Sequence, residues 1–171
     1  MVTASRSQPK WIAVYYRDTD DHLESTSNRE RFIGEGLPDP APAREFIESC
    51  PKPVRAAIRA RIAAVRDYPP PRFPTSTPMW SLMHKPKTKK DVDMSGIFEV
   101  RDKHDKLLYR VFCVLDSQGP SNGLSAPALV MLSGTVKRKG EEVPQAIYRE
   151  VRRQANRYFS LSPRPTVVEP I

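Results

Sequence analysis

"KLLYRVFCVLD", residues 106–116, alternates in the manner of a β-strand and is the most hydrophobic segment of the chain. Its even-numbered and odd-numbered residues point to opposite faces of a sheet. Arg110 therefore lies in a row with Leu108, Phe112 and Val114, all large and apolar. A guanidinium stays protonated in a protein, so its burial requires a partner anion. The stretch predicts a central strand, and the anion that pairs with Arg110 bears directly on function.

Two further strands are predicted beside this one. "GIFEVRD" (96–102) precedes it across the tight turn "KHDK", and "APALVMLSGTV" (126–136) follows it across the looser "SQGPSNGLS". Short connections of this kind join antiparallel neighbours. An earlier segment, "WIAVYY" (11–16), is rich in aromatic and β-branched residues and predicts one more strand.

Helices are predicted before and after the three consecutive strands. "PAREFIESC" (42–50) predicts a short helix, and residues 52–67 a longer one with prolines at its N-terminal edge. "PQAIYREVRRQANRY" (144–158) predicts the last helix. This order favours an α+β fold, in which a small antiparallel sheet packs on a helical hairpin with a C-terminal helix. We expect one face of the sheet to stay open, with Arg110 on it.

The length of 171 residues predicts a single domain. Residues 1–10 are expected to be a disordered lead-in, 17–42 an inserted loop and 160–171 a C-terminal tail. The prolines of the segment 69–78 are incompatible with regular structure.

The charge balance favours an anionic partner. The chain has 28 Lys and Arg against 20 Asp and Glu, and a pI near 9.7. Nucleic acid is the first candidate, and an acidic protein or a membrane surface the next. Many small basic domains are simply soluble, so charge alone does not decide. Cys50 and Cys113 lie far apart, and no signal peptide, membrane span or zinc-site spacing is visible. We expect a reduced, cytoplasmic protein without a metal or other cofactor.

Basic residues gather at the ends of the predicted strands. Arg101 ends the strand before Arg110, and "KRK" (137–139) ends the strand after it. Side chains of neighbouring antiparallel strands lie within roughly 5 Å of one another. A concavity for a polyphosphate backbone is therefore predicted, with Tyr109, Phe98 or Trp80 as a stacking surface. Its cationic residues would be Arg101, Arg110, Lys137 and Arg138.

Arg110 has a second possible partner within the protein. Glu99 and Asp102 lie on the preceding predicted strand, and a pairing with either would hold the sheet together. The residues alone leave both alternatives open.

The order and spacing of these segments resembles the phage-derived HigB branch of the RelE/ParE toxin superfamily. The resemblance rests on a glycine before a strand that ends in Glu-hydrophobic-Arg, then a Tyr-Arg strand. An apolar strand follows that runs into a basic pair, and then Pro and a helix. It covers residues 43–158 and the strand 11–16, whereas the segments 17–42 and 69–78 exceed the compact family pattern.

The resemblance implies the toxin of a type II toxin–antitoxin system, a ribosome-dependent endoribonuclease (an mRNA interferase) that inhibits translation. RNA's own 2′-hydroxyl would attack the adjacent phosphate without a metal, giving a cyclic phosphate and a free 5′-hydroxyl. The implied partners are messenger RNA on the ribosome and a cognate helix-turn-helix antitoxin, and no membrane is involved.

The resemblance also implies roles for single residues. Arg110 would stabilise the scissile phosphate, Lys137 and Arg138 match the basic pair, and Arg101 would contact the RNA backbone. His84 and Lys85 are the candidates for acid or base, His84 because imidazole titrates near neutrality, with His104 and Glu99 as weaker candidates. The tyrosine that follows the basic pair in RelE corresponds to the region of Pro144, with Tyr148 beyond it. The remaining RNA-binding candidates are Lys85, Lys87, Lys139 and Tyr109.

Two other functions remain open. ParE-like members of the superfamily poison DNA gyrase and cut nothing, but they tend to lack basic residues around the strand arginine. A basic module that binds RNA or the ribosome without catalysis needs charge alone. Arg110 together with "KRK" favours the nuclease over the gyrase poison.

Overall fold

The computed structural model describes residues 11–18, 39–66, 83–84 and 92–167, with only the backbone at 83–84. Several predicted features lie outside these residues. They are the lead-in 1–10, the part of the inserted loop at 19–38, the Pro-rich segment 69–78, Trp80, the side chain of His84, both Lys85 and Lys87, and the end of the tail at 168–171.

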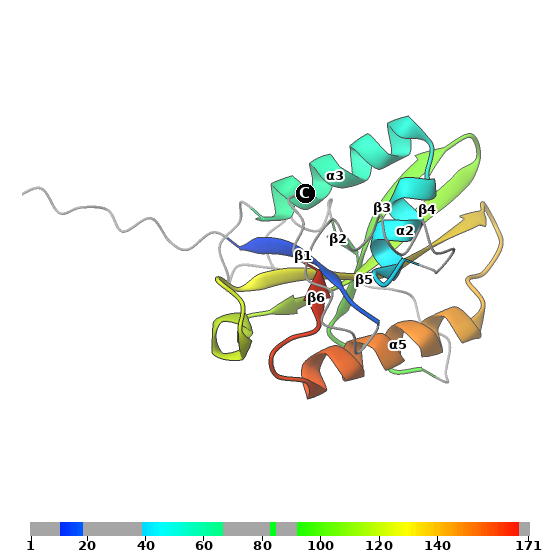
Figure 1. Cartoon of the computed structure of the whole chain (residues 1–171). Helices are drawn as coiled ribbons and strands as arrows, with labels where there is room; N and C mark the ends of the chain where they lie inside the picture. The colour runs from blue at the N-terminus through cyan, green and yellow to red at the C-terminus, as the bar shows by residue number, and fades with distance from the viewer. Residues whose placement is uncertain (1–10, 19–38, 67–82, 85–91, 168–171) are drawn as a thin grey trace, which may run out of the picture.

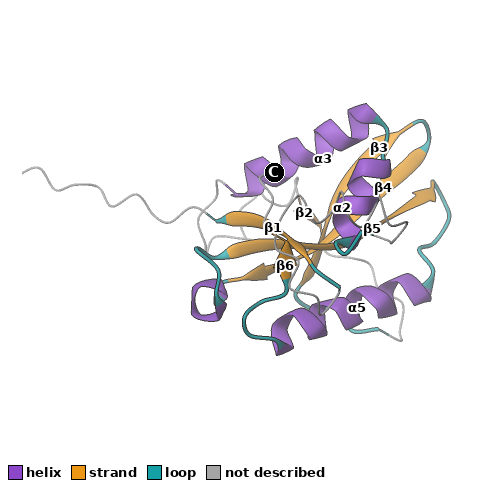
Figure 2. Cartoon of the chain, in the orientation of Figure 1, coloured by secondary structure: helices purple, strands orange, loops and turns teal. Residues whose placement is uncertain are grey.

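A six-stranded sheet forms the centre of the protein, in the order β2-β3-β4-β5-β1-β6 (Figures 1 and 2). All neighbouring strands are antiparallel except β1 and β5, which are parallel. The three consecutive antiparallel strands predicted from the sequence are therefore confirmed. The strands are β1 Ile12–Tyr16, β2 Met83–His84, β3 Ile97–His104, β4 Leu107–Asp116, β5 Ala128–Arg138 and β6 Thr166–Val167.

Helices cover both faces of this sheet. The hairpin of α2 (Pro42–Ser49) and α3 (Lys52–Arg66) packs on one face, and α5 (Gln145–Ser160) packs on the other (Figure 1). The predicted α+β fold and its helices are confirmed. The expectation of an open face is wrong, because the apolar stripe of α5 needs a partner and the sheet supplies it.

The alternation of side chains in the strands builds two separate cores. On the α2–α3 side, Ile47, Val54 and Ile58 pack against the sheet and are fully buried. On the α5 side, the core includes Val151 and Tyr158. The sheet residues of the first core include Val100, Tyr109, Val111, Cys113, Leu129 and Met131, and those of the second include Ile97, Phe112, Val114, Val130 and Leu132.

The turn between β3 and β4 is a tight hairpin, as the "KHDK" pattern predicted. Asp105 and Lys106 have φ values of 47° and 64°, so both central residues are left-handed. This conformation matches the right-handed twist of the flanking strands. The turn fixes the register in which Arg101 lies opposite Arg110.

One irregularity breaks the register between β4 and β5. Cys113 lies opposite Met131, whereas Phe112 lies opposite Ser133. Leu132 is therefore an extra residue, which is the geometry of a β-bulge. From the bulge to the end of β5, each side chain lies on the face opposite to the one that simple alternation would give it.

Residues 160–171, predicted as a tail, fold back onto the sheet as far as residue 167. β6 pairs with β1, and Val167 is buried. Arg164 donates from Nε to the buried carboxylate of Asp116 at 2.9 Å, and Tyr158 donates its hydroxyl to the same oxygen. The polar composition of the segment concealed these contacts, which are all long-range in sequence.

Candidate anion-binding site

The sheet face that packs on α5 carries polar side chains near the β3–β4 turn. Strand register arranges them in rows that cross β3, β4 and β5, with Arg110 at the centre. Direct neighbours in such rows lie about 4.5–5.5 Å apart, and diagonal neighbours about 7–8 Å apart. The rows, starting from the turn, are Lys103–Leu108–Lys137, Arg101–Arg110–Thr135 and Glu99–Phe112–Ser133.

Glu99 is the fully buried acceptor of this arrangement. Its Oε1 accepts a hydrogen bond of 2.6 Å from Nε of Arg101, and Nη2 of Arg101 forms an ion pair with the same oxygen. Nη1 of Arg110 lies 3.1 Å from Oε1 and 3.4 Å from Oε2. The alternative in which Arg110 pairs with Glu99 is therefore realised, because a buried carboxylate needs a charged or hydrogen-bonding partner.

The two arginines use different edges of their guanidinium groups. Arg101 places its Nε–Nη2 edge on Glu99, so its planar fork is occupied. Arg110 contacts Glu99 through Nη1 alone. Its Nε is buried and has no hydrogen-bond partner among the described residues. The Nε–Nη2 edge, which suits bidentate binding of a carboxylate or phosphate, is thus left unsatisfied on Arg110.

A cavity of about 250 Å³ lies at the turn end of β3 and β4. Three successive register pairs line it, and Arg61 of α3 completes the lining. Arg61, Asp102 and Tyr109 line it from the α2–α3 face, whereas the side chains of Arg101 and Arg110 point to the α5 face, where they meet Glu99. The pairs are Arg101–Arg110, Asp102–Tyr109 and Lys103–Leu108.

The charges around the cavity are divided between the two faces of the sheet. Arg61 and Asp102 lie on the α2–α3 face, whereas the side chains of Arg101, Lys103 and Arg110 lie on the α5 face with Glu99. Nη1 of Arg61 lies 3.1 Å from Oδ1 of Asp102. Two positive charges therefore remain unbalanced on the α5 face, around Arg110, and that face favours an anion.

Tyr148 of α5 lies beside the same group of charges. Its ring packs edge-on against Phe112, with 6.1 Å between ring centroids, and the residue is 5% exposed. Burial, followed by the negative charge of Glu99, raises the pKa of Tyr148, whereas Arg110 and Arg101 lower it. Because the net shift is upward, the phenol stays protonated at neutral pH and is a hydrogen-bond donor.

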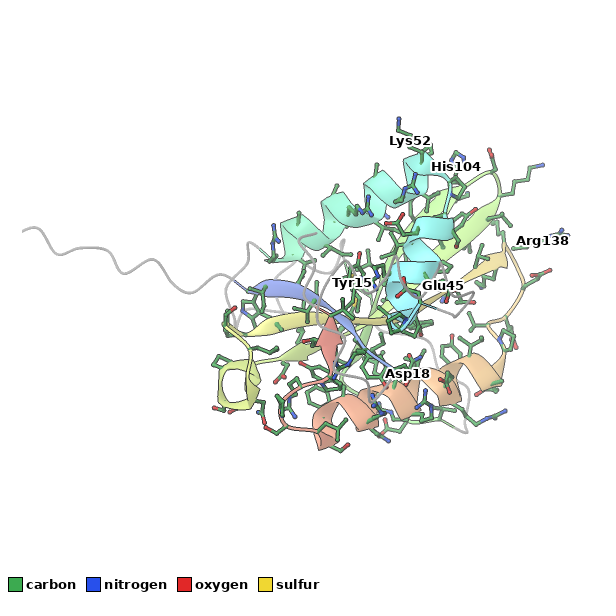
Figure 3. All side chains as sticks on the ribbon, in the orientation of Figure 1. Tyr15, Asp18, Glu45, Lys52, His104 and Arg138 are labelled. Carbon is green, nitrogen blue, oxygen red and sulfur yellow. The ribbon has the colours of Figure 1, made fainter. Side chains whose placement is uncertain are left out.

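The basic pair at the end of β5 is split between the two faces of the sheet. Lys137 shares the face of Arg110, where Nζ donates to the carbonyl of Glu141 at 2.5 Å. Arg138 lies opposite Leu107 on the α2–α3 face and extends outward (Figure 3). The prediction of one concavity for all four cations is therefore wrong for Arg138, because the bulge at Leu132 shifts the alternation.

Tyr109 and Lys139 differ from their predicted roles. Tyr109 lines the cavity, but only 7% of its surface is exposed and the ring packs in the core beneath α3. It therefore offers no free face on which a base would stack. Lys139 is exposed in the turn after β5 and does not line the cavity.

His84 belongs to the edge strand β2. Its backbone pairs with Glu99, so the chain at His84 runs beside the strand that carries the buried carboxylate. The predicted candidate is thereby brought next to the candidate site, whereas His104, the weaker one, lies at the turn and pairs with Asp105 at 3.3 Å.

The arginines of α5 mainly bind other parts of the protein. Arg152 donates to the backbone carbonyls of Asp93 and Ser95. Arg153 binds the carboxylates of Asp18 and Glu150. These contacts anchor the segments around α5, so we do not include them in the candidate site.

Sequence reasoning missed three residues: Lys103 and Tyr148, which lie near Arg110, and Arg61, which lines the cavity. A signal existed for Lys103, because Glu99, Arg101 and Lys103 follow the period of two that places them on one face. No local pattern identified Arg61, since its place depends on how α3 crosses the sheet.

Comparison of the chain with protein-family models, curated proteins and solved structures finds no match. Among the described residues, no three His, Cys, Asp or Glu side chains are grouped so that they would hold a metal ion. In the same part of the chain, no helix is long and apolar enough to cross a membrane.

Proposed function

We propose that this protein is the toxin of a type II toxin–antitoxin system and cleaves messenger RNA on the ribosome without a metal. The resemblance to the HigB branch motivates the proposal. Its motifs coincide with formed elements, since the Tyr-Arg motif lies in the middle of the sheet and the basic pair ends β5. The proposal includes a cytoplasmic location and a helix-turn-helix antitoxin as partner.

The unsatisfied Nε–Nη2 edge of Arg110 carries this proposal. The side chain is held in place by Glu99 through Nη1, is 11% exposed and lies beside Arg101 on a sheet face with surplus positive charge. A phosphate group accepts two parallel hydrogen bonds from such an edge once the side chain turns enough to expose Nε, which is buried here. A donor that is positioned before the reaction stabilises charge that develops in the transition state.

The proposed chemistry is an internal transfer of the phosphate ester. The 2′-oxygen forms a bond to phosphorus and gives its proton to a base, while the bond to the 5′-oxygen breaks and that oxygen takes a proton from an acid. Arg110 would stabilise the charge on the non-bridging oxygens. His84 is the proposed base, and the protonated phenol of Tyr148 is the proposed acid.

Primer extension on messenger RNA tests the proposal. The purified protein is added to a translation reaction, and the same RNA without ribosomes is the control. New 5′-ends in the translated message alone are the expected result. Intact message together with gyrase-linked DNA breaks would indicate the ParE-like alternative instead.

A binding module without catalysis is the second candidate. The contact between Arg110 and Glu99 favours it, because a paired arginine serves structure and RNA affinity without any reaction. The two candidates differ in outcome: the module would bind ribosomes or RNA in a salt-dependent manner and leave the message intact.

A further inference from the structure

The sheet face that packs on α5 is only partly covered by that helix. α5 begins at Gln145, and Tyr148 packs on Phe112, which is fully buried. Two rows of residues lie between Phe112 and the β3–β4 turn, and all their side chains are at least partly exposed. We call them the uncovered rows; they are Arg101–Arg110–Thr135 and Lys103–Leu108–Lys137.

The uncovered rows carry an excess of positive charge. Strand alternation places four cations on this one face, namely Arg101, Lys103, Arg110 and Lys137. Among the residues of these rows and of the row that follows them, Glu99 is the only carboxylate. Three positive charges are left over once Lys137 is included, so this part of the face favours a polyanion.

Three of these cations have donors that the protein leaves available. Arg101 is one-third exposed and binds Glu99 through Nε and Nη2, so its Nη1 remains. Lys103 is exposed and forms no ion pair with any described residue. Lys137 donates one hydrogen bond from Nζ, to the carbonyl of Glu141, which leaves two of its three donors. Binding through these groups therefore requires no buried donor.

The row nearest the turn has a lysine at each end. Lys103 lies opposite Leu108 on one side, and Lys137 lies opposite it on the other. Direct neighbours in such a row are about 5 Å apart, so the β-carbons of the two lysines are roughly 10 Å apart. This spacing suits a chain of phosphates that crosses the strands. Leu108 is partly exposed and offers the sugars or bases an apolar surface between the two charges.

We propose that single-stranded RNA crosses the uncovered rows, with its backbone phosphates bound by Lys103, Lys137 and Arg101. Leu108 contacts a sugar or base between these phosphates. The path passes beside Arg110, so it leads the message to the proposed reaction centre. This inference rests on the proposed function or on its second candidate, because both take RNA as the ligand.

Fluorescence anisotropy of a short labelled oligouridylate at several salt concentrations tests the inference. Each phosphate that is neutralised contributes about 0.7 to the slope of log K against log salt. Lys103→Ala and Lys137→Ala should each lower the slope by about this amount, and the double variant by about twice as much. Leu108→Ala should weaken binding and leave the slope unchanged, because it removes an apolar contact only.

Two controls remove a positive charge from the other side of the sheet. Arg138→Ala changes the residue next to Lys137, which lies on the α2–α3 face, and Lys52→Ala changes an exposed residue at the start of α3 (Figure 3). Both should leave the slope unchanged, and melting temperatures establish that all variants are folded. Equal losses of slope in Arg138→Ala and Lys137→Ala would overturn the inference, because total charge would then determine binding.

A poly-glutamate peptide of matched charge is the second ligand. It should bind more weakly than the oligouridylate, because its side chains offer no ring that packs on Leu108. Tighter binding of the peptide would overturn RNA as the ligand of the uncovered rows. Slopes that depend on the face of the sheet, together with an uncleaved message, would support this RNA path and contradict the proposed cleavage alone. Cleavage of the message with slopes that neither Lys103→Ala nor Lys137→Ala changes would overturn the RNA path alone.

Discussion

Arg110 and Glu99 form a pair in which the carboxylate is fully buried and only one guanidinium nitrogen is used. Nη1 lies 3.1 Å from Oε1, while the buried Nε has no partner among the described residues. Pairing with Glu99 and the proposed binding of an external phosphate use different edges of one guanidinium. The resemblance implies that Arg110 stabilises the scissile phosphate of RNA, and the structure shows the carboxylate of Glu99 as its partner within the protein.

Arg110→Ala should lower RNA cleavage by about 10²–10³, the typical effect of removing one donor aimed at the transition state. Glu99 would keep its contacts with Arg101, so the free energy of unfolding should fall by only about 1–3 kcal/mol. Primer extension and thermal unfolding of the same preparation measure both effects. Arg110→Lys is the control, since it keeps the charge and loses the planar fork, and it should stay poorly active. Full activity of a folded Arg110→Ala protein would end this assignment.

Glu99→Gln should destabilise the protein more than Arg110→Ala does. Loss of a buried charge partner costs about 3–5 kcal/mol, and the lower end is expected because Arg101 is one-third exposed and water screens its charge. Urea unfolding measures the change. Asp105→Asn, which alters an 87% exposed carboxylate at the turn, should change stability by less than about 0.5 kcal/mol. Equal stabilities of the two variants would contradict a structural role for Glu99.

Gly134→Ala should destabilise the contact between β5 and α2. A Cβ atom built at Gly134 would lie 2.0 Å from Cδ1 of Phe46, so the aromatic ring would have to move. Overpacking of this kind costs about 1–3 kcal/mol. Chemical denaturation of Gly134→Ala, Phe46→Ala and the double variant forms a cycle. The double variant should be more stable than the sum of the single effects predicts, and strict additivity would show that the ring does not oppose the new methyl group.

The stability of the protein should fall between about pH 10 and 12. Burial and the hydrogen bond to Asp18 raise the pKa of Tyr16 to about 12, against the lowering effect of Arg157. The folded state then holds the phenolic proton more tightly than the unfolded chain, so stability present below pH 10 is lost as the pH rises. Tyr16→Phe should reduce this loss by on the order of 2–3 kcal/mol. Urea unfolding at pH 9, 10, 11 and 12 tests this, and an unchanged slope in Tyr16→Phe would refute it.

Local periodicity determined the elements of this fold. The predicted helix 52–67 is found as Lys52–Arg66, and the predicted strand 106–116 as Leu107–Asp116. The hydrophobic repeats of 3.6 residues in a helix and two residues in a strand involve residues that are close together in the chain, so a single sequence reveals them. The tight turn at Asp105 and Lys106 was equally local, and it placed Arg101 opposite Arg110.

Contacts between distant segments determined the rest. The C-terminal segment folds back as β6 because Arg164 binds Asp116. The second face of the sheet is covered because α5 packs on it. Neither contact leaves a pattern in adjacent residues. The same holds for Arg61, whose side chain reaches the cavity only because α3 packs across β3.

The basic pair Lys137–Arg138 shows which property the local sequence determined and which one depended on packing. The sequence determined that Lys137 and Arg138 end a strand next to Arg110. Simple alternation along β5 from Met131 would have placed Arg138 on the face of Arg110, but the extra residue Leu132 places Lys137 there instead. A bulge reverses every side chain beyond it because the strand repeat is two residues. Only the packed sheet, where β4 and β5 bury both of their faces, decided which cation accompanies Arg110.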